Sequence, residues 1–221
     1  MQSYTVLSIQ IGRARAHPPA EPGGKSWRSA IDKQPISGPL ALGSEGLEGD
    51  AQADRRFHGG PERALLAYDH GHYAGWREEL GRGELPPGSF GENLTVVGLS
   101  ESEACIGDRF SLGLAVVQIS QPRVPCVKLA RRLATPDIVA RAFATGRTGF
   151  YLRVLREGRV SAGPLVLLER PFPELTVALG IRRLVDPVDD PAMNALASCP
   201  LLSDDYRRTL VRALSRARSM R

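Results

Sequence analysis

The chain has 221 residues, of which 42% are hydrophobic and 24% are charged, a balance typical of globular proteins and not of disordered or fibrous ones. Its net charge of +5, from 29 basic and 24 acidic residues, favours anionic ligands but is too small to indicate a nucleic-acid-binding protein. No segment approaches the roughly 20 apolar residues that span a bilayer and the first residues lack the pattern of a signal peptide, so we expect a cytoplasmic protein that binds neither nucleic acid nor membrane.

The first part of the chain, residues 1–170, shows short apolar runs interrupted by Gly and Pro, which predicts a β-rich domain. The runs predicted to be strands are residues 3–12, 63–69, 94–99, 105–120 and 149–169. Glycines mark the turns, because glycine adopts the positive φ that tight turns need. We expect chain reversals at Gly107-Asp108 and at Leu112-Gly113, and a further reversal at Glu157-Gly158 that joins two strands.

Short helices are predicted between these strands. Asp69 can cap a helix in which Tyr73, Trp76 and Leu80 recur at intervals of three and four residues, which places all three on one buried face. Another helix is predicted over residues 135–144, where Thr and Pro stand at its start.

In residues 171–221 the apolar residues recur with the periodicity of helices, which predicts a small three-helix unit. Ser203 opens the last helix, with two aspartates in the first turn where negative charge is favourable. One stripe of this helix is apolar and should pack inward: Tyr206, Leu210, Leu214 and Ala217. Because so short a unit is near the size limit for independent folding, we expect it to dock on the β domain.

The stretch SQPRVPCVKL places Cys126 directly behind Pro125, with Arg123 and Lys128 on either side. Pro125 suits the first turn of a helix through residues 126–133, and the unpaired N–H groups of a first turn favour negative charge. With two cations nearby, we expect Cys126 to be held as a thiolate that projects from a loop. The alternative, that Cys126 is a small buried hydrophobic residue, stays open.

The other two cysteines, Cys105 and Cys199, stand in apolar surroundings and are interpreted as packing residues. Three widely spaced cysteines indicate neither a disulfide framework nor a zinc site of the CxxC kind. Lysine is rare, since every base other than Lys25, Lys33 and Lys128 is Arg, which suggests that these three are chosen for position.

Three further stretches present backbone suited to an anion or a flat ring: RFHGGPERAL, GSFGENLTV and EPGGKSW. Adjacent glycines let main-chain N–H groups approach a ligand closely. Each stretch also has a plain structural interpretation, as a turn, a strand entry and a loop without the Walker spacing. None of them is decisive alone.

In this order and spacing, HGG, FGENL and SQPR-PC-KL resemble the MOSC domain, the molybdenum cofactor sulfurase C-terminal domain family, in its stand-alone bacterial YiiM-like branch. The resemblance covers nearly all of residues 1–170, and the trailing helices resemble the three-helix extension of that branch. It implies a mainly β fold, in which a barrel-like domain with a few helices occupies residues 1–170 and the helical extension residues 171–221.

The resemblance implies binding of the molybdenum cofactor (molybdopterin), with Cys126 as the ligand of the metal. It implies a reductase that converts N-hydroxylated compounds, such as N-hydroxylated purine bases, to amines and so detoxifies them. Pyridoxal phosphate binding is also associated with the family. Because nothing in the chain resembles a flavin or nicotinamide site, electrons must come from a separate donor protein. A homodimer is the default expectation, since dimers are the commonest soluble assembly.

The resemblance also places other residues near the cofactor. Those that could hold its phosphate are Lys25, Ser26, Arg28, His58, Gly59 and Gly60. Those that could bond the ring or the substrate are Asn93, Gln121, Arg123 and Lys128. For the catalytic proton donor, His58 is the first candidate because imidazole titrates near neutrality, and Glu92 is the second.

Two other functions remain open. Cys126 could carry a persulfide and deliver sulfur to another metal centre. Alternatively, the chain is a non-catalytic module that binds a pterin or nucleotide, with Cys126 merely buried.

Overall fold

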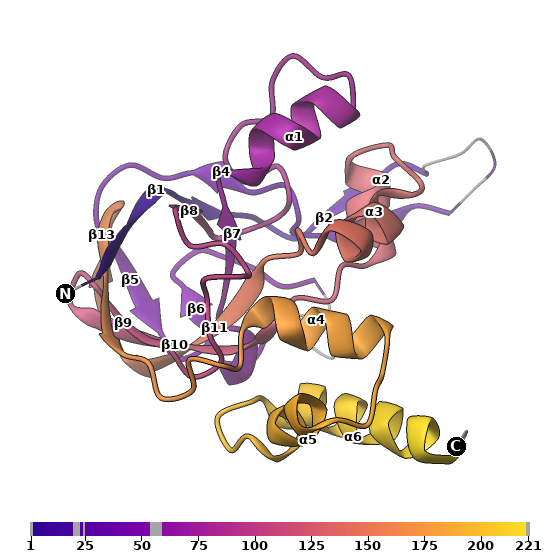
Figure 1. The fold of residues 1–221 in the computed structure, drawn as a ribbon. Helices are drawn as coiled ribbons and strands as arrows, with labels where there is room; N and C mark the ends of the chain where they lie inside the picture. The colour runs from indigo at the N-terminus through magenta and orange to yellow at the C-terminus, as the bar shows by residue number, and fades with distance from the viewer. Residues whose placement is uncertain (1, 20–22, 24, 54–58, 220–221) are drawn as a thin grey trace.

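The structure is a computed structural model that describes residues 2–19, 23, 25–53 and 59–219. Seven of its strands close into a barrel (Figure 1). In order around the barrel they are β13 (Gly163–Glu169), β9 (Arg109–Leu112), β10 (Ala115–Pro122), β11 (Phe150–Arg156), β7 (Leu65–Asp69), β8 (Leu94–Val97) and β1 (Ser3–Ile11). Pairing of β1 with β13 closes the ring, and β7 with β8 is its parallel pair. The predicted β-barrel is confirmed.

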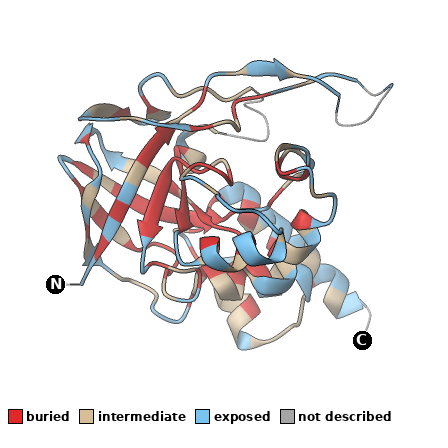
Figure 2. Cartoon of the chain, turned by 90° about the horizontal axis from the view of Figure 1, so that it is seen from above, coloured by how far each residue is buried: buried red, intermediate tan, exposed pale blue. Residues whose placement is uncertain are grey.

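The barrel has an apolar interior because its strands point alternate, apolar side chains inward. Phe110, Val117 and Leu152 are fully buried there, and Figure 2 shows stretches of buried residues, in red, along the strands of the barrel. On β7, Leu65 belongs to this core, whereas its neighbour Leu66 does not. The side chains on the outer faces of β7 and β11 therefore point away from this core and can line a cavity outside the barrel.

The reversal predicted at Glu157-Gly158 is wrong. The chain forms a separate short strand there, β12 (Gly158–Val160), which pairs with β5 (Leu40–Gly43) and not with β11. A Cβ on Gly158 would lie 2.7 Å from the carbonyl carbon of Leu114. This glycine therefore permits close backbone packing and is not the centre of a hairpin turn.

The remaining strands are short. They are β2 (Arg15–His17), paired with β3 (Trp27–Ser29); β4 (Gln34–Pro35), on the end of β1; and β6 (Gly46–Leu47), paired with β5.

Helix α1 (His72–Glu79) buries Tyr73 and Trp76 as predicted. Its cap differs from the prediction, because the N-cap is Gly71 and no side chain caps it. Asp69 is the last residue of β7, and its Oδ1 accepts a hydrogen bond from the Gly71 amide at 3.2 Å. The carboxylate thus closes a turn between strand and helix.

Two more helices follow β10. Helix α2 (Val127–Arg132) has Cys126 as its N-cap residue, in extended conformation, so the cysteine precedes the first turn and does not lie within it. Helix α3 (Ile138–Thr145) begins later than predicted, with Asp137 at its N-cap.

The C-terminal helices are α4 (Val177–Val185), α5 (Pro191–Ser198) and α6 (Asp204–Ser219), which lie together below the barrel in Figure 1. Their buried side chains, among them Val177, Met193 and Leu210, belong to the same hydrophobic cluster as the barrel interior. The helices are therefore docked on the barrel, as expected. None of the helices in the described part of the chain is long and apolar enough to cross a membrane.

Candidate functional site

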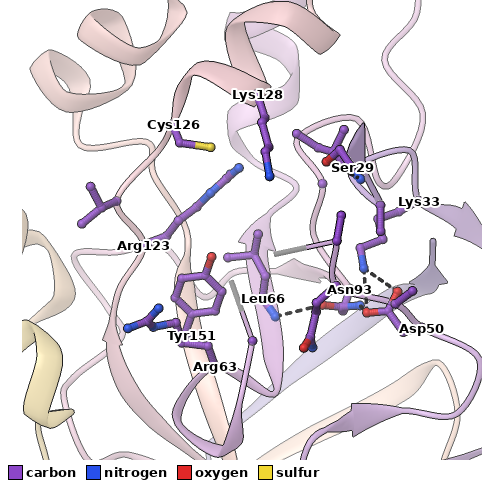
Figure 3. A pocket seen from close by; sticks show the side chains of 18 residues that line it. Ser29, Lys33, Asp50, Arg63, Leu66, Asn93, Arg123, Cys126, Lys128 and Tyr151 are labelled. Carbon is purple, nitrogen blue, oxygen red and sulfur yellow. Dashed lines mark hydrogen bonds and ion pairs between the residues drawn. The ribbon is translucent and has the colours of Figure 1, made fainter. Parts of the chain in front are cut away.

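A cavity lies against the outer face of the barrel. Its walls come from residues 29–33, 50–53 and 123–128, together with side chains from β7 and β11 (Figure 3). The polar and charged side chains that line it are those of Ser29, Lys33, Asp50, Gln52, Arg63, Asn93, Arg123, Cys126, Lys128 and Tyr151. The cavity thus joins segments far apart in the sequence.

Cys126, Arg123 and Lys128 reach the cavity from one side (Figure 3). The residues Cys126 and Lys128 are partly exposed, whereas Arg123 is only 6% exposed. Nη1 of Arg123 is buried and has no hydrogen-bond partner among the described residues. A buried donor without a partner costs free energy. A ligand in the cavity that offers an acceptor to this nitrogen would remove that cost.

An ion pair forms the opposite wall. Nζ of Lys33 donates to both carboxylate oxygens of Asp50, at 2.6 Å to Oδ2. Asp50 also accepts from the amide of Gly12 at 2.7 Å and from Nδ2 of Asn93 at 2.9 Å. Oδ1 of Asn93 in turn accepts from the Leu66 amide at 3.2 Å. Both the nitrogen and the oxygen of the Asn93 side-chain amide therefore form hydrogen bonds within the protein.

Tyr151 lies on the outer face of β11, because its neighbours Phe150 and Leu152 both belong to the barrel core. The register of β10 on β11 runs Ile119 to Leu152 and then Gln121 to Tyr151, which leaves Ser120 as an extra residue. This bulge lies in β10 and bends that strand beside Tyr151. The hydroxyl of Tyr151 points into the cavity (Figure 3).

Burial raises the pKa of Tyr151, and the nearby guanidinium groups of Arg123 and Arg63 oppose this effect. Tyr151 is consequently a phenol, and not a phenolate, at neutral pH.

Five of the residues predicted for the site line this cavity: Gly59, Asn93, Arg123, Cys126 and Lys128. Lys25, Ser26 and Arg28 are exposed and do not line it. Gly60 is the N-cap of the 3-10 turn η1 (Pro61–Arg63) and is not a lining residue. Gln121 is buried behind the wall. His58 lies outside the described residues.

Glu92 is fully buried and is not among the cavity residues. Its carboxylate accepts hydrogen bonds from the amides of Gly88 and Phe90, at 2.7 and 3.1 Å, and from the hydroxyls of Tyr73 and Thr95. The structure therefore places this candidate proton donor in the packing of its own loop, away from the cavity.

Sequence reasoning missed Asp50, Arg63 and Tyr151, and it singled out Lys33 only through the rarity of lysine. Cys105 and Cys199 are buried as expected. Burial, together with the negative charge of Asp108, raises the pKa of Cys105 to about 11. No group of three His, Cys, Asp or Glu side chains suited to a metal ion occurs in the described ranges.

Comparison with known proteins gives a consistent result. A model of the MOSC domain matches residues 54–166. The uncharacterized protein YflK of Bacillus subtilis (strain 168) is 42% identical over 217 residues, which is 97% of this chain and 96% of YflK. The crystal structure of YiiM from Geobacillus stearothermophilus superposes with a TM-score of 0.80 at 36% identity, covering 96% of this chain and 99% of that one.

A protein of Gibberella moniliformis (strain M3125 / FGSC 7600) that is named a reductase is 39% identical over 206 residues, covering 89% of this chain and 35% of that protein. The matches to YflK and YiiM extend through the C-terminal helices as well as the barrel. The chain therefore belongs to the MOSC domain family.

Proposed function

We propose that the chain is a molybdenum-cofactor-dependent reductase that converts N-hydroxylated compounds, such as N-hydroxylated purine bases, to amines. The observation that carries this proposal is the convergence of Cys126, Arg123 and Lys128 on one cavity (Figure 3). A cysteine sulfur is a soft ligand suited to a transition metal, and Arg123 and Lys128 supply positive charge in the same cavity. Membership of the MOSC family and the relative named a reductase support the same class of activity.

The residues of the cavity fit an anionic, oxygen-rich cofactor. Nη1 of Arg123 needs an acceptor, and Lys128 adds a second positive charge beside it. Gly59 has a φ of +96° and lines the cavity, so its main chain can approach a ligand closely. We assign Cys126 as the metal ligand, with Arg123, Lys128 and the main chain of Gly59 holding the polar groups of the cofactor.

The reaction is R–NHOH + 2 e⁻ + 2 H⁺ → R–NH₂ + H₂O, in which the N–O bond breaks and a separate protein supplies both electrons. When bound, the molybdenum centre supplies the redox chemistry of this conversion. Tyr151 supplies a hydrogen-bond donor for an oxygen in the cavity, because its hydroxyl points inward and stays protonated. The electron-donor protein and the homodimer remain predictions.

The test uses protein from a host that makes the cofactor, assayed for molybdenum by elemental analysis and for amine formation with 6-hydroxylaminopurine. We expect Cys126→Ser to lose amine formation and most of its molybdenum, and Cys105→Ala, which removes a buried sulfur outside the cavity, to keep both. A Cys126→Ser protein with full activity would overturn the proposal. A sulfur adduct on Cys126 in protein that lacks molybdenum would favour sulfur transfer instead.

A further inference from the structure

We propose that the C-terminal helices are part of the site, because the turn between α5 and α6 holds Gln121 behind the cavity wall and so positions Arg63, which lines the cavity. This inference rests on the proposed function for its kinetic readout only. It assigns a role in ligand binding to helices that lie outside residues 54–166, the part of the chain that the MOSC model matches.

The first contact runs through Gln121. Oγ of Ser203, at the start of α6, donates to Oε1 of Gln121 at 2.6 Å. Nε of Arg63 donates to the same oxygen at 3.3 Å. Gln121 is 5% exposed and Ser203 is 1% exposed, so water does not readily replace either group. One buried amide oxygen thus joins the C-terminal unit to an arginine that lines the cavity.

The second contact is an ion pair. Nη2 of Arg63 donates to Oδ2 of Asp205, in the first turn of α6, at 2.5 Å. The Arg63 side chain is 14% exposed and that of Asp205 is 58% exposed, so the pair lies at the edge of the protein. Gln121, which Ser203 holds, and Asp205 accept from two nitrogens of one guanidinium, which restricts its orientation.

The backbone around these side chains is tied as well. The amide of Ser203 donates to the carbonyl of Ser120 at 2.9 Å, and Oγ of Ser120 donates to the carbonyl of Glu62 at 2.6 Å. Nη2 of Arg153, on β11, donates to the carbonyl of Leu201 at 2.7 Å. The α5–α6 turn therefore contacts β10 and β11, and β10 holds η1 in turn.

Helix α4 packs on the same wall. A Cβ on Gly180 would lie 2.7 Å from Cγ of Pro122, the residue before Arg123. The hydroxyl of Tyr206, on α6, donates to the carbonyl of Gly180 at 3.0 Å. This close approach means that a shift of the helices would displace the strand end that carries Arg123.

A positioning role predicts a specific kinetic effect. An arginine loses considerable rotamer freedom when it binds a ligand, and a guanidinium that is already oriented loses less. Loss of this restraint should weaken binding while the reaction step is unchanged, so KM rises and kcat does not fall.

The test compares Asp205→Asn and Ser203→Ala with a matched control, Asp204→Asn. Asp204 is the neighbouring carboxylate and pairs with Arg207 on its own helix. We expect KM to rise about two- to fivefold for Asp205→Asn, an exposed pair, and about fivefold for Ser203→Ala, with kcat within about twofold of wild type. Asp205→Glu and Ser203→Thr should recover most of the loss, and Asp204→Asn should match wild type.

A second readout needs no activity. Hydrogen exchange of the peptide over residues 59–66 in cofactor-free protein should be faster in Asp205→Asn than in Asp204→Asn. If Asp205→Asn matches Asp204→Asn in exchange and in KM, the inference is overturned, even if Ser203→Ala does not fold. If the wild type forms no amine, the proposed function fails, while the exchange comparison still decides whether the turn positions this wall.

Discussion

Replacing Asp50 with Asn perturbs the ion pair on the wall of the cavity while keeping the side-chain volume. The Lys33 and Asp50 side chains are 7% and 3% exposed, so their charges are shielded from water. Asn cannot neutralise Lys33, and with one acceptor oxygen in place of two it cannot accept from both the Gly12 amide and Nδ2 of Asn93 in the same way. Breaking a buried pair by removing one partner costs about 3–5 kcal/mol, because it leaves an uncompensated charge. We expect a loss of this size in the free energy of unfolding.

The sign of the pH dependence follows from Lys33. Burial lowers the pKa of Lys33, and Asp50 opposes that effect in the wild type. In the variant the charge of Asp50 is gone and only the weaker attraction of Glu92 remains, so the native state binds the lysine proton still more weakly than the unfolded chain does. The free energy of unfolding should therefore rise with pH, from the lowered native pKa up to the ordinary lysine value of about 10.4.

Urea unfolding at about pH 6 and about pH 9 measures both effects. The double variant Lys33→Met/Asp50→Asn is the control, because it removes the stranded charge and should recover part of the lost stability. The reasoning is refuted if Asp50→Asn stays within about 1 kcal/mol of wild type at both pH values.

Three further predictions follow from the site and the fold. In folded protein at pH 7–9, iodoacetamide should modify Cys126 and leave Cys105 intact, because burial raises the pKa of Cys105 to about 11; peptide mass spectrometry checks this, and equal labelling would contradict it. Tyr151→Phe should lower kcat/KM about 10- to 100-fold in the amine assay while molybdenum content is unchanged, and wild-type kinetics would exclude the hydroxyl from the reaction. Gly180→Ala should reduce stability by about 1–3 kcal/mol in urea unfolding, since the new Cβ meets Pro122; no loss would show that α4 shifts freely.

Local patterns in the sequence predicted local structure well. The alternation in residues 3–12 and the apolar stripe of α6 reflect burial of one face, which needs only neighbouring residues to recognise. Barrel closure is different, because β1 and β13 pair across almost the whole barrel domain. Only the family resemblance predicted that closure. The prediction that Asp69 caps helix α1 was wrong, because strand β7 continues through this residue before the helix starts.

The residues of the site also divide into those that are neighbours in the sequence and those that only the fold brings together. Arg123, Cys126 and Lys128 lie within six consecutive residues, so one stretch of sequence was enough to group them. The pairing of Lys33 with Asp50 and the contact of Arg63 with Asp205 join segments far apart in the chain, and no spacing rule predicts them. Tyr151 alternates with the core residues Phe150 and Leu152, but no pattern in the sequence shows that the outer face of β11 lines a cavity. These residues could be found only once the fold had brought their segments together.

X-ray absorption at the molybdenum edge addresses the bond between Cys126 and the metal. Both wild type and Cys126→Ser would be loaded with cofactor and measured at known molybdenum content. The account predicts that the metal in the wild type has one more sulfur neighbour than the metal retained by the variant. An identical set of sulfur neighbours in the two proteins would show that Cys126 does not bind molybdenum.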